Sequence, residues 1–157
     1  RTEVPGATVA FTAGAGSTQY IDAGPPTGLL EYRIRSCSAG VCSPWSPTVQ
    51  SYYGLAPQIT LGAVLNIALT SADLTADVTA FQAPTTVVFR ISTDPSFTAS
   101  TVLPTIDAGA GSTSLLVMGA ATGLDDDTTY YVRAEATNLW GTSTSAVGTF
   151  VTLGGGD

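Results

Sequence analysis

A strand-like pattern that occurs twice, as YRIR at 32–35 and as YYVR at 130–133, most constrains how this chain can fold. In both copies the side chains alternate between two faces with a period of two, which is typical of a half-buried β-strand. A second motif, GAGST, recurs at 14–18 and 109–113. Both motifs therefore repeat at an interval of roughly 95–98 residues, which is the size of one β-sandwich module.

The composition argues against several classes of partner. Only 11% of the residues are charged, and the net charge is −7, with five arginines and neither lysine nor histidine. Such a chain repels phosphate backbones and anionic lipid surfaces, so we expect no nucleic-acid binding. The longest apolar run, around Ala63–Leu69, is interrupted by Asn66 and is too short to span a bilayer. We therefore also expect no membrane insertion.

The two cysteines, Cys37 and Cys42, flank a short turn. A dithiol redox motif needs Cys-x-x-Cys and a structural zinc site needs four ligands, so a disulfide or two free thiols remain. Cys37 shares the outward face of a strand with Arg33 and Arg35, and a strand returning from the turn places Cys42 within disulfide range. We predict a disulfide and, with it, an extracellular location, because disulfides persist in oxidising compartments. Two reduced cysteines in a cytosolic hairpin are the alternative.

Two motifs near the C-terminus carry a resemblance to a known family. Leu124, Thr128 and Tyr130 fit a Leu-x-x-x-Thr-x-Tyr corner, and Asn138 and Gly141 fit an Asn-x-x-Gly turn between the last two strands. These motifs resemble fibronectin type III modules of the kind found in bacterial surface and secreted proteins and in phage virion proteins. The stretch GLLEYRIRSCSAGVCSPWSP resembles the last two strands of another such module, in a variant with a cysteine pair across the hairpin.

The resemblance implies an all-β fold of tandem immunoglobulin-like β-sandwiches, the first of them incomplete at its N-terminus. Residues 1–53 would be the C-terminal part of one module, 54–57 a linker, 58–153 a complete module and 154–157 a Gly-rich tail. A sandwich buries its core between two sheets, so residues 1–53 alone would leave Leu30, Tyr32 and Ile34 facing water. We expect the remaining strands upstream in the same polypeptide; strands added by another chain are the alternative.

Strand patterns extend through the complete module. Alternation predicts that Tyr130, Val132 and Ala134 face the core, together with Leu74 and Val88. Helix signals are absent, because no stretch has a sustained period of 3.6. The predicted strands lie near 58–62, 66–70, 74–80, 86–92, 100–104, 113–118, 128–137 and 143–152.

Four aromatic residues are candidate interface residues. Tyr52 and Tyr53 lie in the junction between the copies, where they are expected to pack between modules or to be ordinary strand-end residues. Trp45 and Trp140 lie in or beside the last hairpins of their copies. An exposed Trp can stack on a sugar ring or anchor a protein interface. We expect instead that each Trp covers the edge of its sandwich.

The chain lacks the groups on which most catalysis depends. It has no histidine for general-base work and no lysine for Schiff-base chemistry, and its serines have no base partner. We therefore expect no enzymatic activity, no catalytic residues, no bound metal and no cofactor. Asp125, Asp126 and Asp127 offer oxygens of the kind that Ca²⁺ prefers, but three consecutive acids do not converge, and a solvated turn is the better interpretation.

Three classes of function remain. The first is a structural module of an extracellular or virion assembly, such as a fibre, filament or surface appendage, whose partners are copies of itself or other assembly subunits. The second is an adhesin or carbohydrate-binding accessory domain of a secreted protein, with a glycan as its ligand. The third is a spacer in a larger secreted enzyme. The repeat and the missing catalytic groups favour the first, although a fold alone does not define a function.

Overall fold

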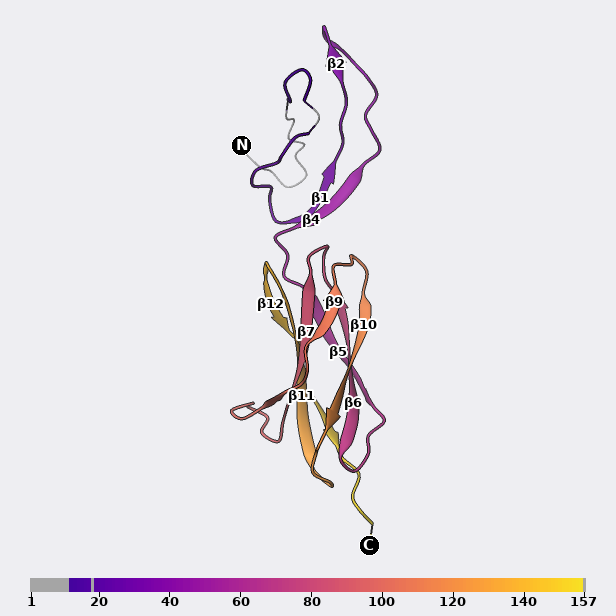
Figure 1. The fold of residues 1–157 in the computed structure, drawn as a ribbon, viewed down its shortest axis with the longest axis vertical. Helices are drawn as coiled ribbons and strands as arrows, with labels where there is room; N and C mark the ends of the chain where they lie inside the picture. The colour runs from indigo at the N-terminus through magenta and orange to yellow at the C-terminus, as the bar shows by residue number, and fades with distance from the viewer. Residues whose placement is uncertain (1–11, 18, 157) are drawn as a thin grey trace.

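The computed structural model describes residues 12–17 and 19–156; residues 1–11, Thr18 and Asp157, which belong to the predicted first module and tail, lie outside this part of the chain. The described residues form thirteen β-strands and no helix. Accordingly, the described residues include no helix long and apolar enough to cross a membrane. Figure 1 shows a two-stranded ribbon (Gly28–Tyr53) that extends the long axis of a β-sandwich.

The sandwich consists of two antiparallel sheets. One has the order β10-β6-β5, and in the other β11 pairs with β7, β12 and β13, while β7 also pairs with β8 and β9. The strands of the first sheet are β5 (Gln58–Leu65), β6 (Ser71–Thr79) and β10 (Leu115–Thr122). Those of the second are β7 (Thr85–Ser92), β8 (Thr101–Val102), β9 (Ile106–Gly109), β11 (Thr129–Asn138), β12 (Gly141–Thr144) and β13 (Gly148–Val151).

The core lies between these two sheets. Along β11, Tyr130, Val132 and Ala134 are buried, as the alternation predicts, and Leu74 on β6 is fully buried opposite them. The prediction for Val88 is wrong by one position: Val87 and Phe89 are fully buried, whereas Val88 is half-buried on the outer face. The run Val87-Val88-Phe89 is apolar at every position, so the sequence does not fix which residues face inward.

The sheets approach each other closely in the middle of the core. A Cβ placed on Gly119 of β10 would lie 2.8 Å from the Phe89 ring of the opposite sheet. The absence of a side chain at Gly119 therefore makes room for the largest fully buried side chain of the sandwich. Close packing of this kind is what core stability depends on.

Tyr130 closes one end of the sandwich. Its ring, only 7% exposed, stacks on Phe150 with a centroid distance of 5.6 Å. Its hydroxyl accepts a hydrogen bond from the backbone N–H of Asp125 at 2.9 Å. Leu124 is buried beside it. The predicted corner is therefore present, and it joins the loop after β10 to the start of β11.

Three strand predictions need correction. Residues 66–70 form no strand; they are the turn from β5 to β6, in which Asn66 has a φ of 48° and its side-chain amide donates to Asp73. The predicted strand 143–152 is interrupted at Ser145, which divides β12 from β13. Strand β9 was not predicted, because the short segment Ile106–Gly109 has no sustained alternation.

The ribbon has two antiparallel parts. Strand β1 (Gly28–Tyr32) pairs with β4 (Val49–Tyr53), and β2 (Cys37–Ser38) pairs with β3 (Val41–Cys42). The predicted continuous strand through Tyr32–Cys37 is wrong between these parts, where residues 33–36 leave regular strand geometry. Ile34 is 75% exposed, as expected for a single sheet without a covering partner.

The loop after β7 is held by Asp94. Its carboxylate accepts hydrogen bonds from the backbone N–H groups of Ser96 and Thr98 and from the Thr98 hydroxyl. The bond from the Thr98 hydroxyl, followed by those from the backbone, lowers the pKa of Asp94 below its ordinary value of 3.8. These bonds fix the turn that carries Phe97 toward the outer face of β11.

We expect Tyr130→Ala to lower the free energy of unfolding by about 3–5 kcal/mol, because it removes a buried aromatic ring. Tyr130→Phe keeps the ring and should cost about 1 kcal/mol, the value of one hydrogen bond. Urea denaturation measures both changes. Tyr131→Phe, on the opposite face of the same strand, is the matched control. A loss below about 1 kcal/mol for Tyr130→Ala would contradict the buried corner.

The Asp94 loop predicts a pH-dependent contribution to stability. A group whose pKa is lower in the folded state stabilises the fold above its unfolded pKa and loses this effect as the pH falls through the folded value. We therefore expect Asp94→Asn to lower the melting temperature at pH 7, with a difference from wild type that shrinks below pH 3.8. Asp77→Asn, at an exposed strand position, controls for the loss of one charge. A difference that is constant from pH 7 to pH 2 would contradict the prediction.

Candidate functional site

The described residues do not bring together the ligands of a metal site. No cluster of three His, Cys, Asp or Glu side chains occurs among them. A shallow depression of about 370 Å³ opens between the end of β7 and the corner, and Tyr130 is its only lining residue that ionises. Chemistry is therefore better sought on the surfaces, where the predicted aromatic residues and cysteines lie.

The tip of the ribbon is a disulfide-closed hairpin. Cys37 and Cys42 are directly opposite in the β2–β3 register, with a Cα–Cα distance of 4.1 Å, and they form the predicted disulfide. The two turn residues, Ala39 and Gly40, have φ values of 49° and 82°. Two successive residues with positive φ define the type I′ turn that matches the twist of paired strands. A disulfide fits an oxidising environment.

Serine hydroxyls maintain the pairing where the ribbon leaves strand geometry. The N–H of Ile34 donates to Ser46 Oγ at 3.0 Å, and the N–H of Ser46 donates to the Ile34 carbonyl at 2.8 Å. The Ser46 hydroxyl in turn donates to the Pro47 carbonyl. We call this arrangement a serine lock. Ser43 forms a second one with Ser36, two residues further toward the tip.

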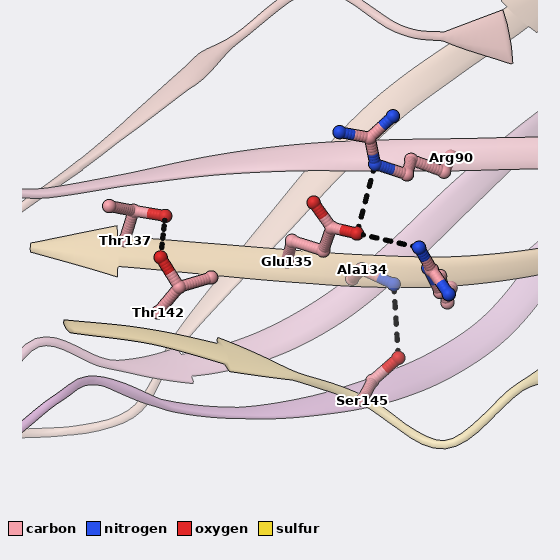
Figure 2. A network of polar contacts seen from close by, with 7 residues as sticks. Arg90, Ala134, Glu135, Thr137, Thr142 and Ser145 are labelled. Atoms are coloured by element: carbon pink, nitrogen blue, oxygen red, sulfur yellow. Dashed lines mark hydrogen bonds and ion pairs between the residues drawn. The ribbon is translucent and has the colours of Figure 1, made fainter. Parts of the chain in front are cut away.

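The sandwich contains the same serine lock. The N–H of Ala134 donates to Ser145 Oγ at 3.0 Å, the N–H of Ser145 donates to the Ala134 carbonyl, and the Ser145 hydroxyl donates to the Ala146 carbonyl. Figure 2 shows the bond between Ala134 and Ser145. In the repeat of YRIR and YYVR, Ser36 of the second lock corresponds to Ala134, and Ile34 corresponds to Val132. The burial of these last two residues differs completely, because Val132 is 0% exposed and Ile34 is 75% exposed.

The outer face of the ribbon carries two arginines and a tryptophan. The guanidinium of Arg35 lies 4.4 Å from the centroid of the Trp45 ring, and that of Arg33 lies 5.5 Å from it. All three side chains are exposed. We call them the arginine face. Trp45 was predicted to cover a sandwich edge, but what it covers in this structure is the pair of guanidinium groups.

The outer face of β11 also carries arginines, but there a carboxylate neutralises their charge. Arg133 lies over the Phe97 ring at 4.5 Å, and both it and Arg90 pair with Glu135, at 3.1 and 2.9 Å. Figure 2 shows Arg90 and Glu135 in contact across adjacent strands. A single carboxylate thus serves two cations on this face.

The other three candidate interface residues lie where the ribbon joins the sandwich: Tyr52 and Tyr53 at the base of the ribbon, and Trp140 in the turn between β11 and β12. Tyr53 packs on Trp140 with a centroid distance of 4.7 Å, and Tyr52 packs on Phe81 at 5.2 Å. The N–H of Tyr52 also donates to Gln82 Oε1 at 3.1 Å. We call these contacts the joint. Of the two interpretations of Tyr52 and Tyr53, the structure supports packing between parts of the chain.

The linker is bound to the same end of the sandwich. Asn138, at the end of β11, donates from its side chain to the Leu55 carbonyl at 3.0 Å and accepts from the N–H of Trp140 at 2.8 Å. This one residue therefore shapes the turn that presents Trp140 and fixes the linker beside it. The partners of Tyr52, Phe81 and Gln82, were not predicted. Both have a positive φ, of 50° and 61°, and no pattern in the sequence indicates this conformation.

The acidic loop, Asp125–Asp127, lies at the opposite end of the sandwich from the joint. Its three side chains are exposed. Its backbone is held by bonds from Asp125 N–H to the Tyr130 hydroxyl and from Asp127 N–H to the Leu153 carbonyl. The loop is therefore a fixed turn with a dense negative charge.

Comparison with known proteins identifies the class of fold. No family model matches this chain, and no curated protein matches it. The sensor domain of the anti-sigma factor RsgI4 from Pseudobacteroides cellulosolvens is similar, with a TM-score of 0.51 and 19% identity over 62% of this chain and 95% of that one. The FN1–FN3 domains of chicken CNTN1 match with a TM-score of 0.43 and 16% identity, over 85% of this chain and 46% of that one.

The sheet arrangement defines the fold as an all-β sandwich of the immunoglobulin-like and fibronectin type III-like class, and the similarity to the RsgI4 sensor domain supports a sandwich fold. Identities this low show the fold alone, and this fold serves many unrelated functions. The function must therefore be argued from the surfaces of this chain.

We expect Trp140→Ala to loosen the ribbon from the sandwich, because it removes the ring on which Tyr53 packs. ¹⁵N relaxation of the full chain would then show residues 28–53 reorienting faster than residues 58–151, while the two parts of the wild type reorient together. Leu139→Ala, in the same turn and 69% exposed, is the matched control. Unchanged relaxation in Trp140→Ala would mean that Tyr52 and the linker alone hold the joint.

Proposed function

We propose that this chain is a non-catalytic structural module of an extracellular or virion assembly, such as a fibre, filament or surface appendage. The observation that carries the proposal is the joint. Two aromatic pairs and two hydrogen bonds, one of them from Asn138 to the linker, connect the ribbon to the sandwich. A joint of this kind resists bending between consecutive parts of the chain, and an element that transmits shape along an assembly needs this property.

The inner face of the ribbon supports the same proposal. The ribbon shares the serine lock of the sandwich, yet Ile34 is exposed where its counterpart in the repeat, Val132, is fully buried. Exposed apolar β-surface of this kind favours packing against another sheet. We propose that a second sheet of the assembly covers this face, from the same polypeptide or from another chain.

The remaining parts of the proposal rest on chemistry. The disulfide between Cys37 and Cys42 supports a location outside the reducing cytosol. The absence of histidine and lysine from the sequence supports a role without catalysis, since these residues supply most general bases and amine nucleophiles. Partners are then other assembly subunits or further copies of this chain.

The alternative is a carbohydrate-binding accessory domain. It would use the exposed faces of Trp45 and Trp140, on which sugar rings stack. The contacts made by both rings weigh against it, because Arg33 and Arg35 lie over Trp45, and Tyr53 packs on Trp140. A spacer role in a larger enzyme fits the same fold, but no feature of the described surface favours it.

The proposal predicts concentration-dependent association of the full chain. Sedimentation velocity from roughly 10 μM to 1 mM, which covers the weak contacts from which polymers are built, should show species larger than the monomer. Electron microscopy of the same samples should show elongated particles. A chain that stays monomeric throughout this range, and that binds an immobilised glycan until Trp45 and Trp140 are changed to Ala, would overturn the assembly role in favour of sugar binding.

A further inference from the structure

We propose that the arginine face, Arg33, Arg35 and Trp45, is one half of a head-to-tail contact whose other half is the acidic loop of a second copy of this chain. The inference rests on the proposed function, because it names the contact through which the assembly grows. It is argued from three observations: unpaired cations, a missing carboxylate and a fixed acidic loop at the other end of the molecule.

The cations are exposed and held in place. Arg35 and Arg33 lie 4.4 and 5.5 Å from the Trp45 ring centroid. A guanidinium stacked on an aromatic face keeps its in-plane N–H groups available, so it can still bind a carboxylate with two parallel hydrogen bonds. Neither arginine forms an ion pair with any residue in the part of the chain that the structure describes. Trp45 therefore presents two ordered donor groups to a partner.

In the sandwich, the arginines on the outer face are paired with a carboxylate. On β11, Arg133 and Arg90 are neutralised by Glu135. The repeat of YRIR and YYVR aligns Arg35 with Arg133, and the lock at Ser36 aligns with the lock at Ala134 at the same interval, so Cys37 corresponds to Glu135. The ribbon thus carries a disulfide-bonded cysteine at the position where the sandwich carries the neutralising acid. A carboxylate for this face has to come from a partner.

A second copy of this chain can supply that carboxylate. Its net charge is −7, and its densest run of acids is Asp125–Asp127. The backbone of this loop is fixed by Tyr130 and Leu153, so binding orders only the side chains. A prearranged loop loses little conformational freedom on binding, which favours association.

The positions of the two halves set the geometry of the assembly. Asp127 is bonded to the C-terminal segment at Leu153, and Figure 1 shows that this terminus and the ribbon tip near β2 lie at opposite ends of the long axis. A contact that joins opposite ends of identical subunits is heterologous. Such a contact produces an open filament whenever the rotation between neighbours does not close a ring.

Charge reversal tests the contact in the full chain. The face variant is Arg33→Glu/Arg35→Glu, and the loop variant is Asp125→Arg/Asp126→Arg. Asp127 is left unchanged because its φ is 44°, which an Asp tolerates better than an Arg. Thr60→Arg/Asp77→Arg, an exposed cross-strand pair on β5 and β6, is the control for altered charge elsewhere. Melting temperatures establish that all three variants remain folded.

We expect each reversed variant alone to associate at least about tenfold more weakly than wild type, because like charges then meet at the contact. An equimolar mixture of the two variants should recover association, since each then offers the charge that the other lacks. The control should associate like wild type. Association of the wild type should weaken between about 0.05 and 0.5 M salt, as the Debye length shortens.

The outcomes separate this contact from the assembly role. If wild type associates, but both variants associate equally well and the mixture shows no recovery, the contact is wrong while the assembly role stands. If wild type does not associate at all, both fail. If wild type stays monomeric but binds alginate, a polymer of uronic acids, and the face variant does not, then the arginine face recognises an acidic sugar and the second-copy contact is overturned.

Discussion

The alternation of side chains along β11 is the constraint on which the rest of the structure depends. This one strand pairs with β7, β12 and β13, so its register fixes the position of the whole second sheet. Its inward residues fill the core, Tyr130 at its start closes one end, and Asn138 at its finish binds the linker at the other end. A slip of one residue would exchange the two faces of the strand and remove the corner and the joint together.

The sequence predicted what alternation and turn chemistry determine locally. Tyr130, Val132 and Ala134 lie in the core because polar neighbours separate them, whereas Val88 was misplaced in a run where every residue is apolar. The segment 66–70 was misjudged as a strand because its apolar residues hide a turn that depends on Asn66 and its bond to Asp73. The register of Val88 depends on pairing with the distant strand β11, whereas the turn depends on a hydrogen bond between residues only seven apart, whose geometry the sequence pattern does not reveal. The number of modules in the whole protein stays a prediction.

The candidate surfaces were predictable in kind but not in arrangement. Aromatic residues near the junction suggested packing there, and the ring of Tyr53 packs on that of Trp140, more than eighty residues away in the sequence. The partners of Tyr52 lie in a loop with two left-handed residues, a conformation that only the folded sandwich imposes. Similarly, Trp45 is equally compatible with sugar, protein or edge packing until the positions of Arg33 and Arg35 are known.

The serine locks have a consequence for how the ribbon can recruit neighbours. In each lock the serine N–H points toward the paired strand, so the next residue along, Pro44 or Pro47, occupies a position whose N–H would point outward. Proline has no N–H to offer there, and such positions protect a sheet edge from unwanted extension. This edge of the ribbon is thus a poor template for a further strand. The side chains on the two faces of the ribbon therefore determine which partner it binds.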